Sequence, residues 1–311
     1  MIDIDRIDEQ LALAVTEVRV TVPRTPAPVP APTPAPAPAA TVAPPRPRRE
    51  RERVARKEPA APVAAPVRVA KRHQPAPSSM TVPELVELGF VDEADAAIAR
   101  TVDRRDLVTW TTMRALLAGR HKAVTAGIAE LRTLDEERAW IQRFWAAIEW
   151  GTEEERYEVL DHARTRAYRF DDLDWWGNVT LLLAGMGKHD EAERAFDEAS
   201  ELLAGRPKDA AWLDVLTNLV EAAAALGDWG RVAAAGRALR WPEDRLVVVG
   251  PGVVCKGSVE RYRALAHVAA GHWDKAEECF RRAEAAHRAI GATPILRRTQ
   301  QQASALLTTA A

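Results

Sequence analysis

The chain has 311 residues, in which 43 Lys and Arg nearly balance 45 Asp and Glu. This near-balance argues against a wholly cationic nucleic-acid protein, and two cysteines are too few for a disulfide scaffold. No apolar run approaches the roughly 20 residues needed to cross a bilayer, so no membrane span is expected. Sixteen of the 21 prolines lie between Pro23 and Pro77, whereas all ten tryptophans lie at or after Trp110. The sequence therefore predicts an N-terminal part that cannot pack and a C-terminal part that can.

Residues 1–20 form the first predicted element, a short amphipathic helix. Its apolar residues recur at steps of three and four, which places them on one helix face: Ile4, Ile7, Leu11, Ala14 and Val18. A helix of about 16 residues is marginal alone in water, so this one is either a frayed terminus or a docking helix that folds against a partner. The acidic start has neither the basic and apolar regions of a secretion signal nor the composition of an organelle-targeting peptide, so a cytoplasmic location is expected.

Residues 21–79 are rich in Pro, Ala and Arg and are expected to form a disordered linker. Proline fixes φ and removes hydrogen-bond donors, and few large apolar side chains are present to offset the entropy of ordering. Between Arg46 and Arg72, ten basic residues stand against Glu50, Glu52 and Glu58. Such a charge could contact nucleic acid or another anionic surface weakly, although no aromatic residue is present for base stacking. A solvated spacer is the simpler interpretation.

From residue 80 to about 305, a glycine recurs at the end of successive apolar stretches. The recurring glycines are Gly89, Gly119, Gly151, Gly187, Gly227 and Gly271. A small or apolar residue usually follows five positions later and a bulky one nine positions later, with Arg156 and Gly236 as exceptions. Glycine at a helix C-terminus adopts the left-handed conformation without strain, so each glycine is expected to close a hairpin of two helices.

These hairpins predict the fold class. One helical hairpin cannot bury its apolar face alone, so neighbouring hairpins are expected to stack around a continuous core. The sequence thus predicts an all-α protein whose residues 80–305 form an α-solenoid of antiparallel helical hairpins. The spacings of 40 and 44 residues between the last three glycines exceed the others, and the insertion from Trp241 to Lys256 is expected to bulge from the stack.

The segment from Trp176 to Ala199 resembles a tetratricopeptide repeat. It has an aromatic residue in its first helix, Gly187 in the turn, and Ala192 and Phe196 in its second helix at that family's offsets. The segment around Gly271 matches in its second helix, but Glu260 and Ala264 depart from the pattern of the first helix. This resemblance implies a helical-repeat fold that binds protein or peptide partners on its concave face.

The last 65 residues or so resemble a more particular group. Residues 247–262, 271–277 and 287–294 are similar to the C-terminal helical-repeat region of large bacterial signal-transduction ATPases and regulators, common in actinobacteria. In that group the repeats are taken to sense or dock something while other domains do chemistry. No cyclase, nucleotide site or helix-turn-helix is identified in this chain.

The sequence gives only weak signals for a nucleotide-binding or metal-binding site. Residues 182–189 contain Gly187-Lys188, but Leu182 and His189 stand where a phosphate-binding loop needs glycine and a hydroxyl. His267, His272, Cys279 and His287 lie close in sequence, yet no pair has a compact zinc-ligand spacing. We therefore expect no enzyme, no metal and no cofactor.

The expected partner-binding surface is a ladder on the first helices of successive hairpins. Nine positions before successive turn glycines, the predicted ladder residues are Trp110, Gln142, Asn178, Asn218 and Tyr262, with Glu221 and Arg261 expected to flank them. Amides and aromatics can bind an extended peptide, although polar residues also lie there if that face is simply wet. On this hypothesis, replacing Asn178 and Asn218 with Ala weakens partner capture without lowering thermal stability.

The sequence predicts a non-catalytic interaction protein or regulatory adaptor that holds a protein or peptide partner in the concave face of its repeats. Two alternatives stay open. The first is a transcription-related regulator that contacts nucleic acid through residues 46–72, and the second is a stand-alone relative of the signalling ATPases.

Overall fold

The structure is a computed structural model that describes residues 80–239 and 245–308. The predicted helix at residues 1–20, with Ile4, Ile7, Leu11 and Val18, and the predicted linker at 21–79 lie outside the described residues. The described part is mainly helical, with thirteen helices and two short strands. None of its helices combines the length and apolar character that crossing a membrane requires.

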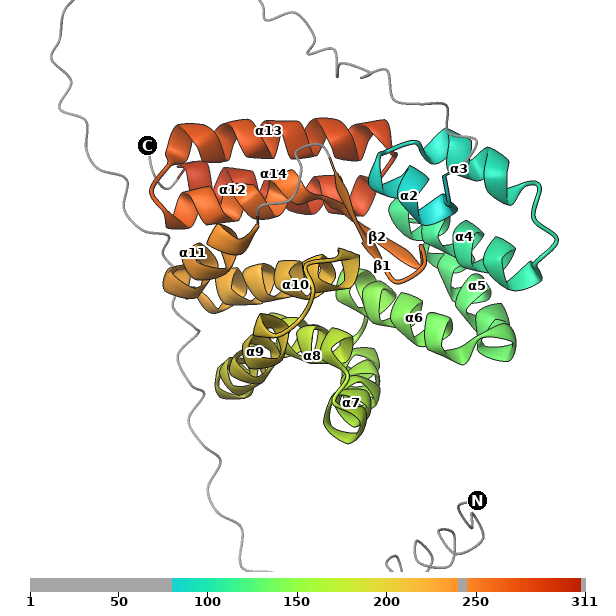
Figure 1. The fold of residues 1–311 in the computed structure, drawn as a ribbon, viewed down its shortest axis with the longest axis horizontal. Helices are drawn as coiled ribbons and strands as arrows, with labels where there is room; N and C mark the ends of the chain where they lie inside the picture. The colour runs from blue at the N-terminus through green and yellow to red at the C-terminus, as the bar shows by residue number, and fades with distance from the viewer. Residues whose placement is uncertain (1–79, 240–244, 309–311) are drawn as a thin grey trace, which may run out of the picture. The chain divides into compact units, whose positions relative to one another are not determined.

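Twelve of the helices are consecutive pairs, and the last one follows alone (Figure 1). In chain order they are α2 (Val82–Glu87) and α3 (Val91–Ile98), α4 (Arg104–Leu117) and α5 (His121–Leu134), α6 (Glu136–Trp150) and α7 (Glu153–Phe170), α8 (Leu173–Gly185) and α9 (His189–Ala204), α10 (Ala210–Leu226) and α11 (Trp229–Ala238), α12 (Val259–Ala269) and α13 (Trp273–Ala289), and finally α14 (Thr293–Thr308).

Each of the six predicted turn glycines lies between the two helices of a pair, so the prediction of helical hairpins closed at these positions is confirmed. Five of them have φ between 71° and 78°, as the left-handed turn requires, whereas Gly151 is extended with φ −63°. The two departures from the repeat pattern have local causes. Arg156 Nε donates to the carbonyl of Ala147 at 3.3 Å, and a Cβ on Gly236 would overlap Ala266, because α11 approaches α12 closely there.

The insertion expected to bulge from the stack is instead part of the core. β1 (Leu246–Val249) and β2 (Val254–Ser258) form an antiparallel hairpin that pairs Leu246 with Ser258 and Val249 with Val254, and every residue of both strands is buried. The expectation of a bulge was wrong because an unbroken run of β-branched residues forms a strand that can be buried on both faces. The fold is therefore mainly helical, but it is not built from helices alone.

The hairpin lies among the first helices of the pairs. β1 packs against α2 and α10, and β2 packs against α4, α6, α12 and α13. In Figure 1 it is seen between α10 and the group formed by α12, α13 and α14. It occupies the place where the sequence predicted an open concave face.

The last described helix, α14, meets α4 near the other end of the described chain. α14 contacts α4, the guanidinium of Arg114 donates to the carbonyl of Ile290 at 3.3 Å, and Pro294 packs on Gly119. One hydrophobic cluster joins side chains from both ends and from the hairpin: Leu85, Val86, Trp110, Met113, Leu117, Leu246, Val248, Cys255, Ile290 and Ile295. Contacts of α4 with α14 and this cluster thus join the two ends of the described helices beside the two strands.

Candidate functional site

The predicted ladder residues are inside the protein. Each is at most 9% exposed: Trp110, Gln142, Asn178, Asn218, Glu221, Arg261 and Tyr262. The expectation that they form an accessible partner-binding surface is therefore wrong for this structure. The physical reason is the β1–β2 hairpin, which covers the face that the stacked first helices would otherwise present to water.

The ladder spacing nevertheless brings neighbouring members together. The amide of Asn218 in α10 donates to Asn178 Oδ1 in α8 at 3.0 Å, in a site with almost no solvent exposure. Since loss of one amide would leave its buried partner without a hydrogen bond, substitution of this pair is now expected to lower stability. This reverses the expectation drawn from the sequence.

Lys256, at the end of the hairpin, lies in a cage of oxygen atoms. Its side chain is 0% exposed, and Nζ donates to Asp214 Oδ1 at 2.6 Å, Thr217 Oγ1 at 2.7 Å, Asn218 Oδ1 at 2.7 Å and the Asp214 carbonyl at 2.9 Å. The ring centroid of Trp145 lies 5.2 Å from the ammonium. Desolvation lowers the pKa of Lys256, and the carboxylate of Asp214 opposes that shift. The hairpin is thus tied to α10 by a buried ion pair.

A second ionic group lies nearby and joins α6, α10, α12 and α14. Arg261 pairs with Glu221, and Arg298 of α14 pairs with Glu149 and, at 3.2 Å, with Glu221. Desolvation opposes ionisation of Glu221, but Arg261 and Arg298 outweigh it and hold its pKa at about 2. With Lys256 and Asp214, this group holds three cations and three carboxylates. We call the six residues the inner network: Glu149, Asp214, Glu221, Lys256, Arg261 and Arg298.

The other ladder residues also make structural contacts. Trp110 Nε1 donates to Asp95 Oδ1 at 2.7 Å, which joins α4 to α3. Gln142 Nε2 donates to the carbonyls of Thr109 and Val253 at 2.9 and 3.0 Å, which joins α6 to α4 and to the hairpin turn. Tyr262 is fully buried.

His287, which the sequence suggested as a possible but improbable metal ligand, has a structural role. Its Nε2 accepts the backbone N–H of Ser258 at 2.8 Å, and its Nδ1 lies 3.2 Å from Thr299 Oγ1. Desolvation, assisted by Arg261, lowers its pKa to about 3, so the ring is neutral at physiological pH. Within residues 80–239 and 245–308, no group of three or more His, Cys, Asp or Glu is arranged to hold a metal ion.

A small pocket, partly open to solvent, adjoins the inner network. Its apolar wall includes Leu117, Trp145 and Ile295, and its charged wall includes Lys256 and Arg298. Both cations are already paired with carboxylates, so the pocket offers no surplus charge to a ligand.

The exposed apolar side chains indicate a candidate binding surface more clearly than the pocket does. Five large apolar side chains of the described part are exposed, and three belong to α7 and its last turn: Tyr157 at 44%, Tyr168 at 67% and Phe170 at 56%. Tyr157 and Tyr168 are 11 residues apart, or about three helical turns, and therefore share one face. The opposite face of α7 is buried through Val159, Leu160, Ala163 and Ala167. Phe170, two residues after Tyr168, projects from the other side of the helix at its last residue. We call these three exposed rings, which lie on two sides of α7, the α7 aromatic surface.

Local contacts hold these aromatic rings in place. Tyr168 packs edge-on against Trp176 with ring centroids 4.4 Å apart, and Lys188 lies 5.1 Å from the Tyr157 ring. The guanidinium of Arg166 lies 5.0 Å from the Phe170 ring. The helix itself is fixed at its start by a capping box between Thr152 and Glu155. The rings are thus presented on an ordered helix and are not loose loop side chains.

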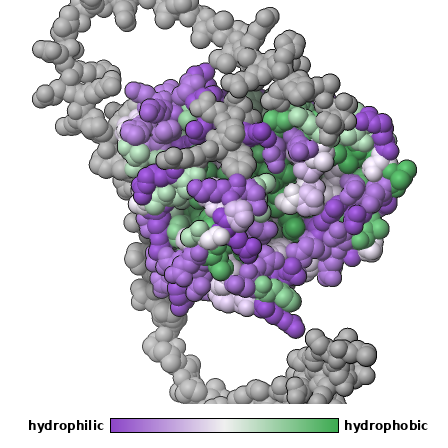
Figure 2. Space-filling model, in the orientation of Figure 1, coloured by the Kyte–Doolittle hydropathy of each residue, from purple (hydrophilic) through white to green (hydrophobic). Residues whose placement is uncertain are grey.

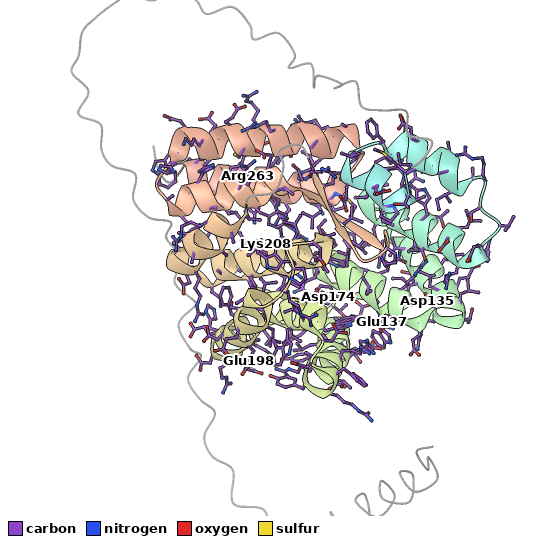
Figure 3. The ribbon with its side chains drawn as sticks, viewed as in Figure 1. Asp135, Glu137, Asp174, Glu198, Lys208 and Arg263 are labelled. Atoms are coloured by element: carbon purple, nitrogen blue, oxygen red, sulfur yellow. The ribbon has the colours of Figure 1, made fainter. Side chains whose placement is uncertain are left out.

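Carboxylates outnumber cations in the part of the sequence that contains α7, α8 and α9. Residues 151–200 carry thirteen Asp and Glu against six Lys and Arg. Figure 3 labels Asp174 and Glu137 at the beginnings of α8 and α6, and Arg166 reaches the carboxylates of Glu137 and Asp172 at 3.6 and 3.3 Å. Desolvation, followed by the carboxylates of Asp214 and Asp172, raises the pKa of the exposed Asp174 to about 7. Like charge therefore acts on Asp174 at the beginning of α8, whereas Arg166 neutralises Asp172 beside it.

The sequence reasoning missed both the caging of Lys256 and the α7 aromatic surface. The residue spacing gave no clear signal for the second, because Phe170 follows buried Ala167 by three residues and yet is exposed at the end of the helix. Comparisons of the chain with protein-family models, curated proteins and solved structures found no match.

Proposed function

We propose that this chain is a non-catalytic interaction protein that binds a protein or peptide partner on the α7 aromatic surface. The observation that carries this proposal is the concentration of three of the five exposed large apolar side chains on one helix. Aromatic side chains are enriched at the energetic centres of protein interfaces, because they bury much apolar area at little entropic cost. Figure 2 shows hydrophilic residues over much of the coloured face, interrupted by hydrophobic patches.

The proposal includes a TPR-like α-solenoid as the scaffold. Six helical hairpins with glycine turns, and contacts of α8 with α10 and of α10 with α12, support this classification. The resemblance of residues 176–199 to a tetratricopeptide repeat supports it as well. The scaffold differs from an open solenoid in one respect, because its inner face is filled by its own β-hairpin and the partner must use the outside.

The absence of catalysis in this proposal is supported by what the buried polar groups do. Lys256 and His287 would attract attention because their pKa values are lowered, yet each is hydrogen-bonded to a group that holds the hairpin in place. Burial raises the pKa of the Cys255 thiol to about 11, which leaves it without nucleophilic character near neutral pH.

Capture from a lysate of the native host tests the proposal. The full chain, immobilised, is compared with the variant Tyr157→Ala/Tyr168→Ala/Phe170→Ala, with bound proteins quantified by mass spectrometry. The matched control is Val102→Ala/Leu134→Ala, which removes the other two exposed apolar side chains. We expect at least one protein to be retained by the wild type and the control and to be lost about tenfold or more from the triple variant, as for interface anchors worth about 1.4 kcal/mol or more. Equal retention by all three chains would refute the assignment.

The basic residues between Arg46 and Arg72 favour a second candidate, a regulator that contacts nucleic acid. Binding of the full chain to DNA and RNA, titrated with salt, distinguishes it. Affinity that falls steeply between about 50 and 200 mM salt would point to phosphate contacts.

A further inference from the structure

The exposed face of α7 carries four side chains at the spacing of a helix–helix contact. Tyr157, Asp161, Arg164 and Tyr168 follow one another at steps of four, three and four residues, which places them in one row along the helix. The two tyrosines and Asp161 are exposed, and the side chain of Arg164 is 37% exposed. We call these four residues the α7 seam. Figure 1 shows α7 at an edge of the described part.

The α7 seam is symmetric about its own midpoint. That midpoint lies between residues 162 and 163, with Asp161 and Arg164 equally far on either side of it, and Tyr157 and Tyr168 equally far beyond them. Two identical helices related by a two-fold axis across them run antiparallel, so each residue faces the one equally distant from the midpoint in the other copy. Asp161 of each copy then faces Arg164 of the other, and Tyr157 of each copy faces Tyr168 of the other. The seam is therefore complementary to itself.

We propose that this chain forms a two-fold dimer in which the α7 seams of two copies pack antiparallel. The proposal rests on the proposed function, because a second copy is then the partner that binds Tyr157 and Tyr168. Aromatic rings contact one another favourably edge to face, and the two Asp–Arg pairs at the centre set the register. Phe170, on the other side of α7, takes no part in this contact.

The charges of the seam select the antiparallel arrangement. In a parallel pair, Asp161 would face Asp161 and Arg164 would face Arg164, so like charges would meet at both positions. Asp161 is exposed and no described cation pairs with its carboxylate, so it can accept a hydrogen bond from a second copy. Arg164 already pairs with Glu191 of α9, but a guanidinium has five N–H donors and can serve two carboxylates. The Glu191 contact therefore positions Arg164 without occupying all of its donors.

Two features limit the strength of the dimer. The region of α7, α8 and α9 is acidic in both copies, and Glu154 would face Asp171 of the second copy at each end of the contact. Both side chains are exposed, and physiological salt screens charges more than about 8 Å apart. The contact uses one helix from each copy, so its area lies at or below the lower end of the roughly 1,200–2,000 Å² that stable interfaces bury. We therefore expect a reversible dimer with a dissociation constant of about 10–100 µM.

Sedimentation velocity of the full chain, from about 1 to 200 µM, measures the association. The wild type should pass from monomer to dimer over this range. Asp161→Arg brings cations together at the centre of the contact, and Arg164→Asp brings carboxylates together there. Each should weaken the dimer by about tenfold or more, and so should Tyr157→Ala/Tyr168→Ala.

An equimolar mixture of Asp161→Arg and Arg164→Asp tests the pairing itself. One chain then carries only cations at positions 161 and 164 and the other carries only carboxylates, so both central pairs of a mixed dimer join opposite charges. We expect the mixture to associate within about threefold of the wild-type affinity, although each variant alone is weakened. Loss of structure in either variant would not produce this recovery.

Two controls change similar side chains away from the seam. Arg104→Asp, in α4, reverses an exposed arginine that also pairs with a carboxylate, that of Glu130. Phe170→Ala removes an exposed ring on the other side of α7. Both should dimerise like the wild type, and circular dichroism with thermal unfolding confirms that all variants fold.

A wild-type chain that stays monomeric at about 200 µM overturns the proposal. A dimer that Asp161→Arg leaves unchanged overturns it too, because the contact then lies elsewhere, and so does a mixture that does not associate. Capture of a different protein that depends on Tyr157 and Tyr168 would retain the proposed function even when the dimer fails. A monomeric chain that captures nothing through these rings would remove both.

Discussion

The position of Lys256 shows how much one residue depends on its surroundings here. A buried ammonium is costly unless it is paired and hydrogen-bonded, and four oxygen atoms within 2.9 Å meet that requirement. The Arg104–Glu130 pair is different, because its side chains are 62% and 40% exposed and water screens their attraction. Although both are ion pairs within hydrogen-bond distance, their contributions to stability should differ greatly.

Lys256→Met tests this difference. It leaves Asp214 buried without its cation, so we expect the free energy of unfolding in urea to fall by about 3–5 kcal/mol. Arg104→Met is the matched control and should change it by about 1 kcal/mol or less. Adding Asp214→Asn to Lys256→Met should recover part of the loss, because the unpaired charge is then absent. A loss of less than about 1 kcal/mol for Lys256→Met would mean that the cage does not hold a charged lysine.

For single residues, the sequence predicted which side chains are neighbours better than it predicted whether they are exposed to solvent. The ladder spacing assigned Asn178 and Asn218 to equivalent positions of neighbouring first helices, and their amides do meet at 3.0 Å. It could not predict their burial, which is caused by a hairpin whose Lys256 lies 38 residues beyond Asn218. Solvent exposure is a property of the tertiary arrangement and is not encoded in the local period.

The β1–β2 hairpin is the element that the helical repeat pattern did not predict. Its end is held in three ways: Gly257 has φ +89°, the backbone N–H of Ser258 donates to His287, and the Ser258 side chain caps α12. The helices were predictable because their turns repeat a glycine signal. The hairpin occurs once, and a short apolar run without repetition does not distinguish a buried strand from an irregular insertion.

Gly257→Ala probes how tightly the hairpin end is packed. A Cβ at Gly257 would overlap the His287 ring and lie 2.9 Å from Ile295 Cγ2, in a backbone conformation that disfavours side chains. We expect the free energy of unfolding to fall by roughly 2–4 kcal/mol, combining backbone strain with overpacking. Gly185→Ala lies in α8 with no atom within 4 Å of its Cβ and should be neutral or stabilising by up to about 1 kcal/mol. Thermal melts that rank the two substitutions the other way would contradict this account of the hairpin.

At the scale of the described domain, the important feature is that the last helix, α14, contacts α4 near the other end of the described chain. A simple repeat stack is quasi-one-dimensional, so each unit depends only on its neighbours. Here α14 supplies Pro294 and Ile295 to a cluster that includes α2 and α4, and Arg298 to the inner network. The repeat pattern predicted the pairs correctly but gave no information on closure, because closure depends on contacts between residues up to about 200 positions apart.

Deletion of residues 293–311 distinguishes a closed stack from a linear one. In a linear stack, amide hydrogen exchange would increase only in α12 and α13, which precede α14. In the closed stack it should also increase in α2, α3 and α4, since the cluster containing Leu85, Trp110 and Met113 loses Ile295. Ile295→Ala is the milder variant in case the deletion prevents folding, and it should cost about 2–5 kcal/mol while raising exchange in the same two regions. Exchange that stays at the wild-type level in α2 to α4 in both variants would show that the two ends fold independently, and the inner face could then open without disturbing the first helices.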